Sequence, residues 1–307
     1  MMKRLKICIS LCLGVFLLSA CDQDIPVDQL KAKYQKSNSA FVTIDGTAVH
    51  YIMEGLAEDT LPLVLIHGTS ASLHTWDTLS SLLKSKKRII RLDLPAFGLT
   101  GPNRLNQYNF KFYNQFLDEF LDALKVTQCI VAGNSLGGSI AWNYALASPD
   151  KVRQLILLDA SGYPKKDEKG SLGFKLAAVP VLNQALKHIS PKSLIRKSLE
   201  DAFYNKSLVS ESMVDQYHDL LLREGNRGAV LELFQHPMKP DATKIKNISQ
   251  PTLIIWGKQD QLISYQNASL FKQDIRNSRM LVLDKVGHIP MEEAPVQVAD
   301  AFLEFIK

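Results

Sequence analysis

The clearest chemical signal in this sequence is one serine placed between two glycines. Ser135 lies in the run Gly133-Asn134-Ser135-Leu136-Gly137, which follows an apolar stretch and precedes a helix-period stretch. This strand–turn–helix context predicts a turn so tight that side chains two residues either side of the serine would collide. Such a turn strains the backbone of the serine and exposes its hydroxyl, as a nucleophile requires. A glycine-rich helix start without chemistry has the same letters, so the interpretation depends on partners elsewhere in the chain.

A serine nucleophile needs a base, and His288 is the histidine best placed for that role. It is one of seven histidines, and it follows the last predicted strand in the run Gly287-His288-Ile289. Loops that follow parallel strands meet at one edge of the sheet, where Ser135 is also expected. His67 follows an earlier strand, and we interpret it as a structural residue that shapes its loop.

Two aspartates compete to orient the histidine. Asp260 follows the next-to-last predicted strand, and Asp159 ends the strand that comes after the serine turn. Either side chain could reach His288 from the same edge of the sheet. We favour Asp260, although its setting also suits a turn or capping aspartate. Asp159 is kept as the alternative acid.

Backbone amides are the expected donors to a negatively charged oxygen that develops during acyl transfer. The amide of Leu136 begins the helix after the serine, and the amide of Thr69 follows His67-Gly68. These two amides are the candidate oxyanion hole.

Apolar runs alternate with helix-period segments along most of the chain, which predicts a parallel sheet with helices on both faces. The first two strands, within residues 41–54, form a hairpin around Asp45-Gly46. Further strands are predicted at 63–66, 88–92, 129–132, 152–158, 252–256 and 279–283. Helices are predicted at 73–84, 110–124, 140–147, 265–273 and 294–306.

The alternation stops between residues 162 and 241, where the pattern is helical. We call this insertion the cap, and residues 40–161 and 242–307 the core domain. Residues 173–182 form a mostly apolar stretch that would line an acyl pocket or pack on the core domain.

The N-terminus has the layout of a bacterial export signal. Lys3, Arg4 and Lys6 precede an apolar stretch at residues 7–20, which is too short for an ordinary membrane span. The run Leu18-Ser19-Ala20-Cys21 resembles the lipobox of bacterial lipoproteins. The resemblance implies cleavage after residue 20, a lipid such as palmitate on Cys21, and a location in the cell envelope facing the periplasm.

The residues after Cys21 refine this expectation. Asp22 resembles the signal for retention in the inner membrane, and residues 21–39 are polar enough to act as a tether. Removing the signal peptide lowers the formal net charge from +5 to +2. That small charge argues against nucleic-acid binding.

The cysteines and the other possible ligands point to no cofactor or metal. Outside the signal peptide and Cys21, the remaining cysteine is Cys129, in a predicted buried strand. No cluster of His, Cys, Asp and Glu has metal-ligand spacing. We therefore expect neither a cofactor nor a metal.

From about residue 41 to residue 306 the chain resembles the α/β-hydrolase family. The resemblance rests on five segments in order: His67-Gly68 and residues 93–98, 133–138, 251–260 and 287–292. It implies an eight-stranded sheet, a helical lid in place of the cap, and a triad of Ser135, Asp260 and His288. It also implies an oxyanion hole at Thr69 and Leu136. Ala96 stands where this family more often has glycine, and we expect little effect.

Carboxylic-ester hydrolysis through an acyl-enzyme is the leading functional hypothesis, because the sequence is similar to small bacterial esterases and lipases. The substrate would be a small or hydrophobic ester near a membrane. Ser135 argues against dehalogenases and epoxide hydrolases of this family, which use an aspartate nucleophile. The alternatives are a carbon–carbon hydrolase of ring-fission products, which would need a cation from Arg196, Arg223 or Arg227, and a non-catalytic membrane-tethered binding protein.

Overall fold

A computed structural model of the protein describes residues 22–164, 179 and 189–306. It contains an eight-stranded sheet in the order β1-β2-β4-β3-β5-β6-β7-β8, as predicted. β1 and β2 pair antiparallel, as do β2 and β4, and the other neighbours are parallel. The strands are β1 Ser39–Ile44, β2 Thr47–Gly55, β3 Leu63–Ile66, β4 Arg88–Leu92, β5 Cys129–Asn134, β6 Val152–Leu158, β7 Thr252–Gly257 and β8 Ser278–Leu283.

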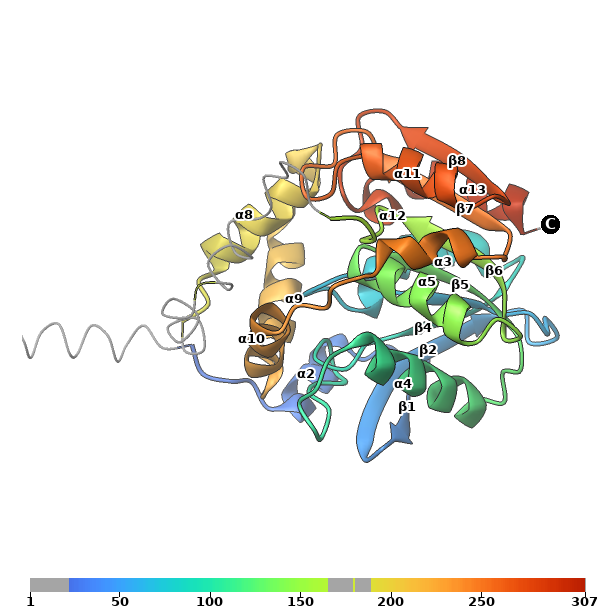
Figure 1. Cartoon of the computed structure of the whole chain (residues 1–307). Coiled ribbons are helices and arrows are strands. Elements are labelled where there is room, and N and C mark those ends of the chain that lie inside the picture. Colours follow the sequence, from blue (N-terminus) through green and yellow to red (C-terminus); the bar gives the residue numbers. More distant parts are fainter. Residues whose placement is uncertain (1–21, 165–178, 180–188, 307) are drawn as a thin grey trace, which may run out of the picture.

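The central strands are buried on both faces because helices cover each side of the sheet (Figure 1). Along β3, Val64 and Ile66 belong to one core cluster, and Leu63 and Leu65 to the other. The first cluster includes residues of α4 (Phe110–Ala123), α5 (Leu136–Ala147) and α11 (Gln266–Asp274). The second includes residues of α3 (Asp77–Leu83) and α13 (Pro295–Phe305).

Most predicted elements agree with the structure to within a few residues. The helix predicted at 73–84 is divided, because η1 (Leu73–Trp76) is a 3-10 helix that leads into α3. Cys129 is fully buried in the sheet, and this burial raises the pKa of its thiol to about 12. It is therefore a small core residue, as expected.

The chain between β6 and β7 contributes helices that lie beyond the ends of the strands, outside the two helical layers (Figure 1). They are α8 (Lys192–Ala202), α9 (Glu211–Leu221) and α10 (Asn226–Gln235), with η2 (Lys206–Leu208). The 3-10 helix η3 (Ala242–Asn247) belongs to the core domain, and its Ile245 lies in the first core cluster. Except for Val179, the apolar stretch 173–182 lies outside the described residues, as do the signal peptide 1–20 and Cys21. No helix among residues 22–164 and 189–306 is long and apolar enough to span a membrane.

The segment after Cys21, which we predict to be a polar tether, contains a short helix and packs on both the cap and the core domain. Its helix α2 (Val27–Tyr34) buries Leu30 to 2% exposure against Leu99 and Leu220. Ile25 forms a parallel bridge with Arg223 of the cap. A few apolar residues on one side of a polar segment are enough to hold it. We call residues 22–36 the N-terminal strap.

Asp93 connects the loops at the carboxyl edge of the sheet. Its carboxylate accepts hydrogen bonds from His50 Nδ1 at 2.8 Å, the Leu73 amide at 2.7 Å and the Leu99 amide at 2.8 Å. Burial opposes ionisation of Asp93, yet the neighbouring His50 lowers its pKa to about 2. The folded state therefore depends on the carboxylate form.

We expect Asp93→Asn to lower the free energy of unfolding by about 2 kcal/mol at neutral pH, because one oxygen that faces two donors becomes a donor itself. Because the pKa of Asp93 is depressed in the folded state, its contribution is present above the unfolded value and is lost as pH falls toward 2. The gap between wild type and variant should therefore narrow between about pH 4 and pH 2 in urea unfolding. Asp45→Asn, in an exposed hairpin turn, is the control. An equal gap at every pH would contradict this role.

Candidate active site

Ser135 occupies a strained turn between β5 and α5. Its backbone has φ 55° and ψ −116°, a conformation that residues other than glycine rarely adopt. A Cβ at residue 133 would lie 2.2 Å from the carbonyl oxygen of Gly137, and one at residue 137 would lie 2.2 Å from that of Ile66. Both glycines are therefore required, and the strain falls on the serine. This geometry agrees with the turn predicted from the sequence.

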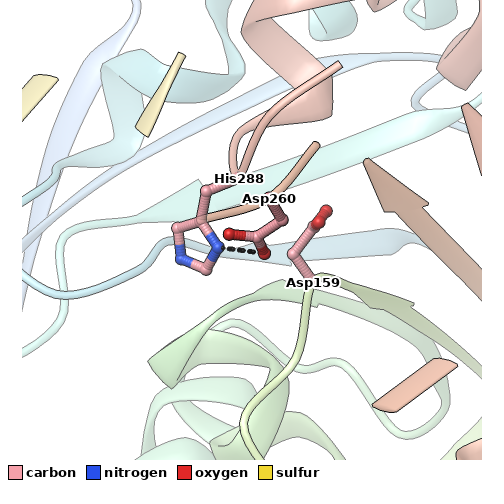
Figure 2. A group of neighbouring side chains, drawn as sticks. All are labelled: Asp159, Asp260 and His288. Atoms are coloured by element: carbon pink, nitrogen blue, oxygen red, sulfur yellow. Dashed lines mark hydrogen bonds and ion pairs between the residues drawn. The ribbon is translucent and has the colours of Figure 1, made fainter. Parts of the chain in front are cut away.

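The structure brings His288 and Asp260 together. His288 lies in the loop between β8 and α12 (Pro290–Glu293), and its Nδ1 is 2.7 Å from Asp260 Oδ2 (Figure 2). The other oxygen, Asp260 Oδ1, accepts hydrogen bonds from the amides of Leu262 and Ile263. The Asp260 side chain is fully buried. These contacts fix the carboxylate, which in turn fixes the imidazole.

Asp159, the alternative acid, lies on the far side of Asp260 from the imidazole of His288 (Figure 2). No hydrogen bond joins Asp159 to that imidazole in the described part of the chain. Its side chain is fully buried, and its Oδ1 accepts a hydrogen bond from the Gly257 amide at 3.0 Å. Burial and the nearby charge of Asp260 raise the pKa of Asp159 well above its usual value. The geometry therefore places Asp260, and not Asp159, against the histidine.

Ser135 and His288 line one cavity of about 150 Å³. No hydrogen bond joins their side chains within the described part of the chain, although such catalytic bonds commonly tighten only when substrate binds. Asn134 links the two loops, because its side-chain amide donates to the His288 carbonyl at 2.9 Å and to that of Leu158 at 3.2 Å. Sequence reasoning missed this residue; its place next to the serine was the available signal.

The candidate oxyanion amides belong to two segments that meet at the serine. Leu136 is the first residue of α5, and Thr69 lines the cavity next to Gly68. The loop packs against the serine, since a Cβ at residue 68 would lie 3.2 Å from Ser135 Cβ. Neither amide donates a hydrogen bond within residues 22–164 and 189–306. His67 holds this loop through Nδ1 to the Gly68 carbonyl and Nε2 to the Leu94 amide, as its structural role predicts.

The cap supplies much of the cavity wall. Apolar side chains predominate there, including Leu194, Ile195, Leu199, Leu221, Val230, Leu231 and Phe234. Tyr217, also in the wall, donates a hydrogen bond to Glu292 of the core domain at 3.0 Å. Thr75 donates to the same carboxyl, and burial raises the pKa of Glu292 to about 7. Nothing in the sequence indicated this connection between cap and core.

Arg227 also lines the cavity, and it is bound to the N-terminal strap. Its guanidinium donates to Asp24 Oδ1 from Nη2 at 2.6 Å and from Nε at 3.1 Å. Nη2 also donates to the Asp22 carbonyl at 2.7 Å. The side chain is 8% exposed, and Nη1 has no partner among the described residues. Arg196 instead forms an ion pair with Glu211. Arg223 donates hydrogen bonds to the backbone carbonyls of Glu224 and Thr100.

Comparison with known proteins agrees with the fold and finds hydrolases among the relatives. The sequence profile of the family described as "alpha/beta hydrolase fold" matches residues 62–295. An uncharacterized hydrolase of Bacillus subtilis, YugF, is 29% identical over 269 residues, covering 86% of this chain and 96% of the relative. A meta-cleavage product hydrolase from Pseudomonas fluorescens superimposes with a TM-score of 0.76 at 22% identity, over 87% of this chain and 97% of that one.

Two further relatives have named activities. The 2-hydroxy-6-oxo-2,4-heptadienoate hydrolase of Pseudomonas putida is 25% identical over 237 residues, covering 74% of this chain and 82% of the relative. Lipase 1 of Psychrobacter immobilis is 27% identical over 248 residues, covering 80% and 76% respectively.

Replacing Gly137 by alanine should destabilise the protein by about 1–3 kcal/mol, because the new Cβ would overlap the Ile66 carbonyl. Gly228→Ala is the matched control, since it is an exposed glycine in α10 with nothing within 4 Å of a Cβ. We expect that control to gain about 0.5–1 kcal/mol from helix propensity. Urea unfolding measures both, and equal effects would contradict the crowding of the serine turn.

Proposed function

The chain belongs to the α/β-hydrolase fold family, and on that basis we propose that it is a serine hydrolase of carboxylic esters. The observation that carries this proposal is one cavity that holds both Ser135, on its strained turn, and His288, fixed by Asp260. Nucleophile, base and orienting acid are what acyl transfer requires.

In the proposed reaction, His288 Nε2 accepts the proton of Ser135 as Oγ attacks the ester carbonyl. The tetrahedral oxyanion accepts hydrogen bonds from the Thr69 and Leu136 amides, and loss of one such donor typically costs ~10²–10³ in rate. The alcohol departs with the proton from His288. Water, activated by the same imidazole, then hydrolyses the acyl-enzyme. Asp260 holds Nδ1 protonated, which leaves Nε2 free to accept.

The cavity wall supports a neutral, hydrophobic acyl group as the substrate. Arg227 is the one permanently charged side chain among the described residues of the wall, and Asp24 balances its charge at 2.6 Å. The remaining wall is mostly apolar, which favours burial of a hydrocarbon chain. Similarity to a lipase supports the same class of substrate.

Carbon–carbon hydrolysis of an acidic ring-fission product is the second candidate. One relative is a 2-hydroxy-6-oxo-2,4-heptadienoate hydrolase. Arg227 lines the cavity, and its buried Nη1 has no hydrogen-bond partner among the described residues, so a carboxylate substrate would require this guanidinium to turn toward it. We favour the ester because Nε and Nη2 of this guanidinium are already bound to the strap.

We further propose that residues 1–20 are a signal peptide and that a lipid on Cys21 holds the protein at the periplasmic face of the inner membrane. Asp22 follows Cys21 directly, and its Oδ2 accepts a hydrogen bond from the amide of Ser190 at 2.6 Å. Ser190 lines the cavity. Lipid attachment at Cys21 would therefore bring the cavity, and not only the chain terminus, close to the bilayer.

Full-length protein in detergent should hydrolyse p-nitrophenyl esters, with activity that rises from acetate to longer acyl chains. Ser135→Ala should reduce kcat by about 10⁴–10⁶-fold at an unchanged melting temperature. Activity on a ring-fission product with none on esters would favour the carbon–carbon hydrolase. A folded wild type without activity on either substrate would favour the non-catalytic binding protein.

Wild type expressed in bacteria should incorporate labelled palmitate and sediment with membranes, whereas Cys21→Ser should lose the label. Cys129→Ser, a change in the buried core, is the control and should keep both properties. Palmitate label retained by Cys21→Ser would exclude Cys21 as the attachment site.

A further inference from the structure

A second carboxyl group, that of Asp159, lies next to Asp260 on the side away from His288 (Figure 2). Asp159 directly follows β6, and its side chain is fully buried. One carboxylate oxygen from each aspartate and one ring nitrogen of His288 all lie within 4.8 Å of one another (Figure 2). Two buried carboxylates at this separation cannot both ionise without a large electrostatic cost.

The hydrogen bonds of the two carboxyl groups account for three of their four oxygens. Both oxygens of Asp260 are occupied, Oδ1 by the two loop amides and Oδ2 by His288 Nδ1. Asp159 Oδ1 accepts from the Gly257 amide. Asp159 Oδ2 is buried without a partner among the described residues. An unpaired buried oxygen is costly unless it carries a proton that finds an acceptor.

We propose that Asp159 is protonated and that its Oδ2–H donates a hydrogen bond to the carboxylate of Asp260, so that the pair carries a single negative charge. This inference rests on the proposed function for its catalytic meaning. Asp159 is then a positioning residue that acts on His288 through Asp260. The hydrogen bond fixes the orienting carboxylate on the side opposite the imidazole.

The electrostatic surroundings of Asp159 agree with a neutral acid. Burial and the charge of Asp260 hold the pKa of Asp159 well above its usual range, and Glu293 contributes in the same direction. Glu293 is committed to the Gly287 amide at 2.6 Å. The charged or titratable groups facing Asp159 are thus Asp260, His288 and Glu293, two of them acidic.

A bound cation is the competing explanation, since the spacing of Asp159, Asp260 and His288 would suit one. A metal needs several ligand atoms with free lone pairs. Here His288 Nδ1 and both oxygens of Asp260 are already engaged, and Asp159 Oδ2 is the ligand atom that has no partner among the described residues. One uncommitted oxygen fits a proton and does not make a metal site.

The test compares Asp159→Asn with Asp159→Ala in full-length protein. Asparagine keeps an acceptor for the Gly257 amide and a donor for Asp260, and it tolerates the φ of 45° at this position. Alanine loses both bonds. For p-nitrophenyl ester hydrolysis, we expect Asp159→Ala to lower kcat/KM about tenfold and to move the acidic limb of the pH profile upward, because an unshared Asp260 charge stabilises the imidazolium.

In Asp159→Asn, the acidic limb of the pH profile should stay at its wild-type position. The amide replaces a neutral acid, so the charge of the pair with Asp260 is unchanged. If Asp159 were ionised, removing its charge would disfavour the imidazolium and move the limb down by about one pH unit or more. That downward shift would overturn the proposal.

Thermal unfolding tests whether Asp159 is protonated in the folded protein, and this measurement does not depend on catalysis. A raised native pKa means that folded wild type keeps a proton that the unfolded chain releases, so wild type loses stability as pH rises. The melting temperature of Asp159→Asn relative to wild type should therefore increase from about pH 5 to about pH 8. Asp284→Asn, an exposed aspartate, should show no such trend.

The same measurement separates the competing explanations. A melting temperature difference for Asp159→Asn that does not change with pH would overturn the proposal, whether or not the protein hydrolyses esters. Stabilisation of wild type by Zn²⁺ or Mn²⁺ that is absent in Asp159→Asn would assign the cluster to a cation and would also overturn it. Absence of ester hydrolysis together with the expected pH trend would reject the ester activity alone.

Discussion

The backbone of Ser135 is held by the neighbouring strand, and the whole site depends on this attachment. Its amide donates to the Leu158 carbonyl at 3.0 Å, and its carbonyl accepts from the Ser161 amide at 3.1 Å. These bonds hold a φ of 55° that an isolated chain would leave. They also bring the end of β6, and with it Asp159, beside the serine turn. The parallel sheet thus fixes Ser135, His288 and Asp260 relative to one another.

Much of the fold could be predicted from the sequence because its signals are local. Strands buried on both faces are continuous apolar runs, and the serine turn needs glycine at two fixed positions. The choice between Asp260 and Asp159 could not be made with certainty, because both aspartates follow neighbouring strands and only side-chain direction separates them. Ala96 adopts a φ of 88°, so the departure from glycine places strain there that composition does not reveal.

The features that escaped prediction are polar contacts between residues far apart in the chain. Asn134 joins two loops, and the Tyr217–Glu292 contact joins cap and core domain. Each residue type is common on protein surfaces, and no periodicity marks it. The N-terminal strap is the most extensive example. Its few apolar residues pack on a surface that includes Leu220, which lies nearly 200 residues later in the chain.

The contact between this strap and Arg227 means that the charge of the cavity is set from outside it. Asp24 lies in a segment remote from the serine, yet it neutralises a cation in the cavity wall. A shorter or altered N-terminus would leave the same walls around an unbalanced guanidinium, and such a cavity would select anions. The charge of the cavity can thus change through a residue that is not among the described residues of its wall.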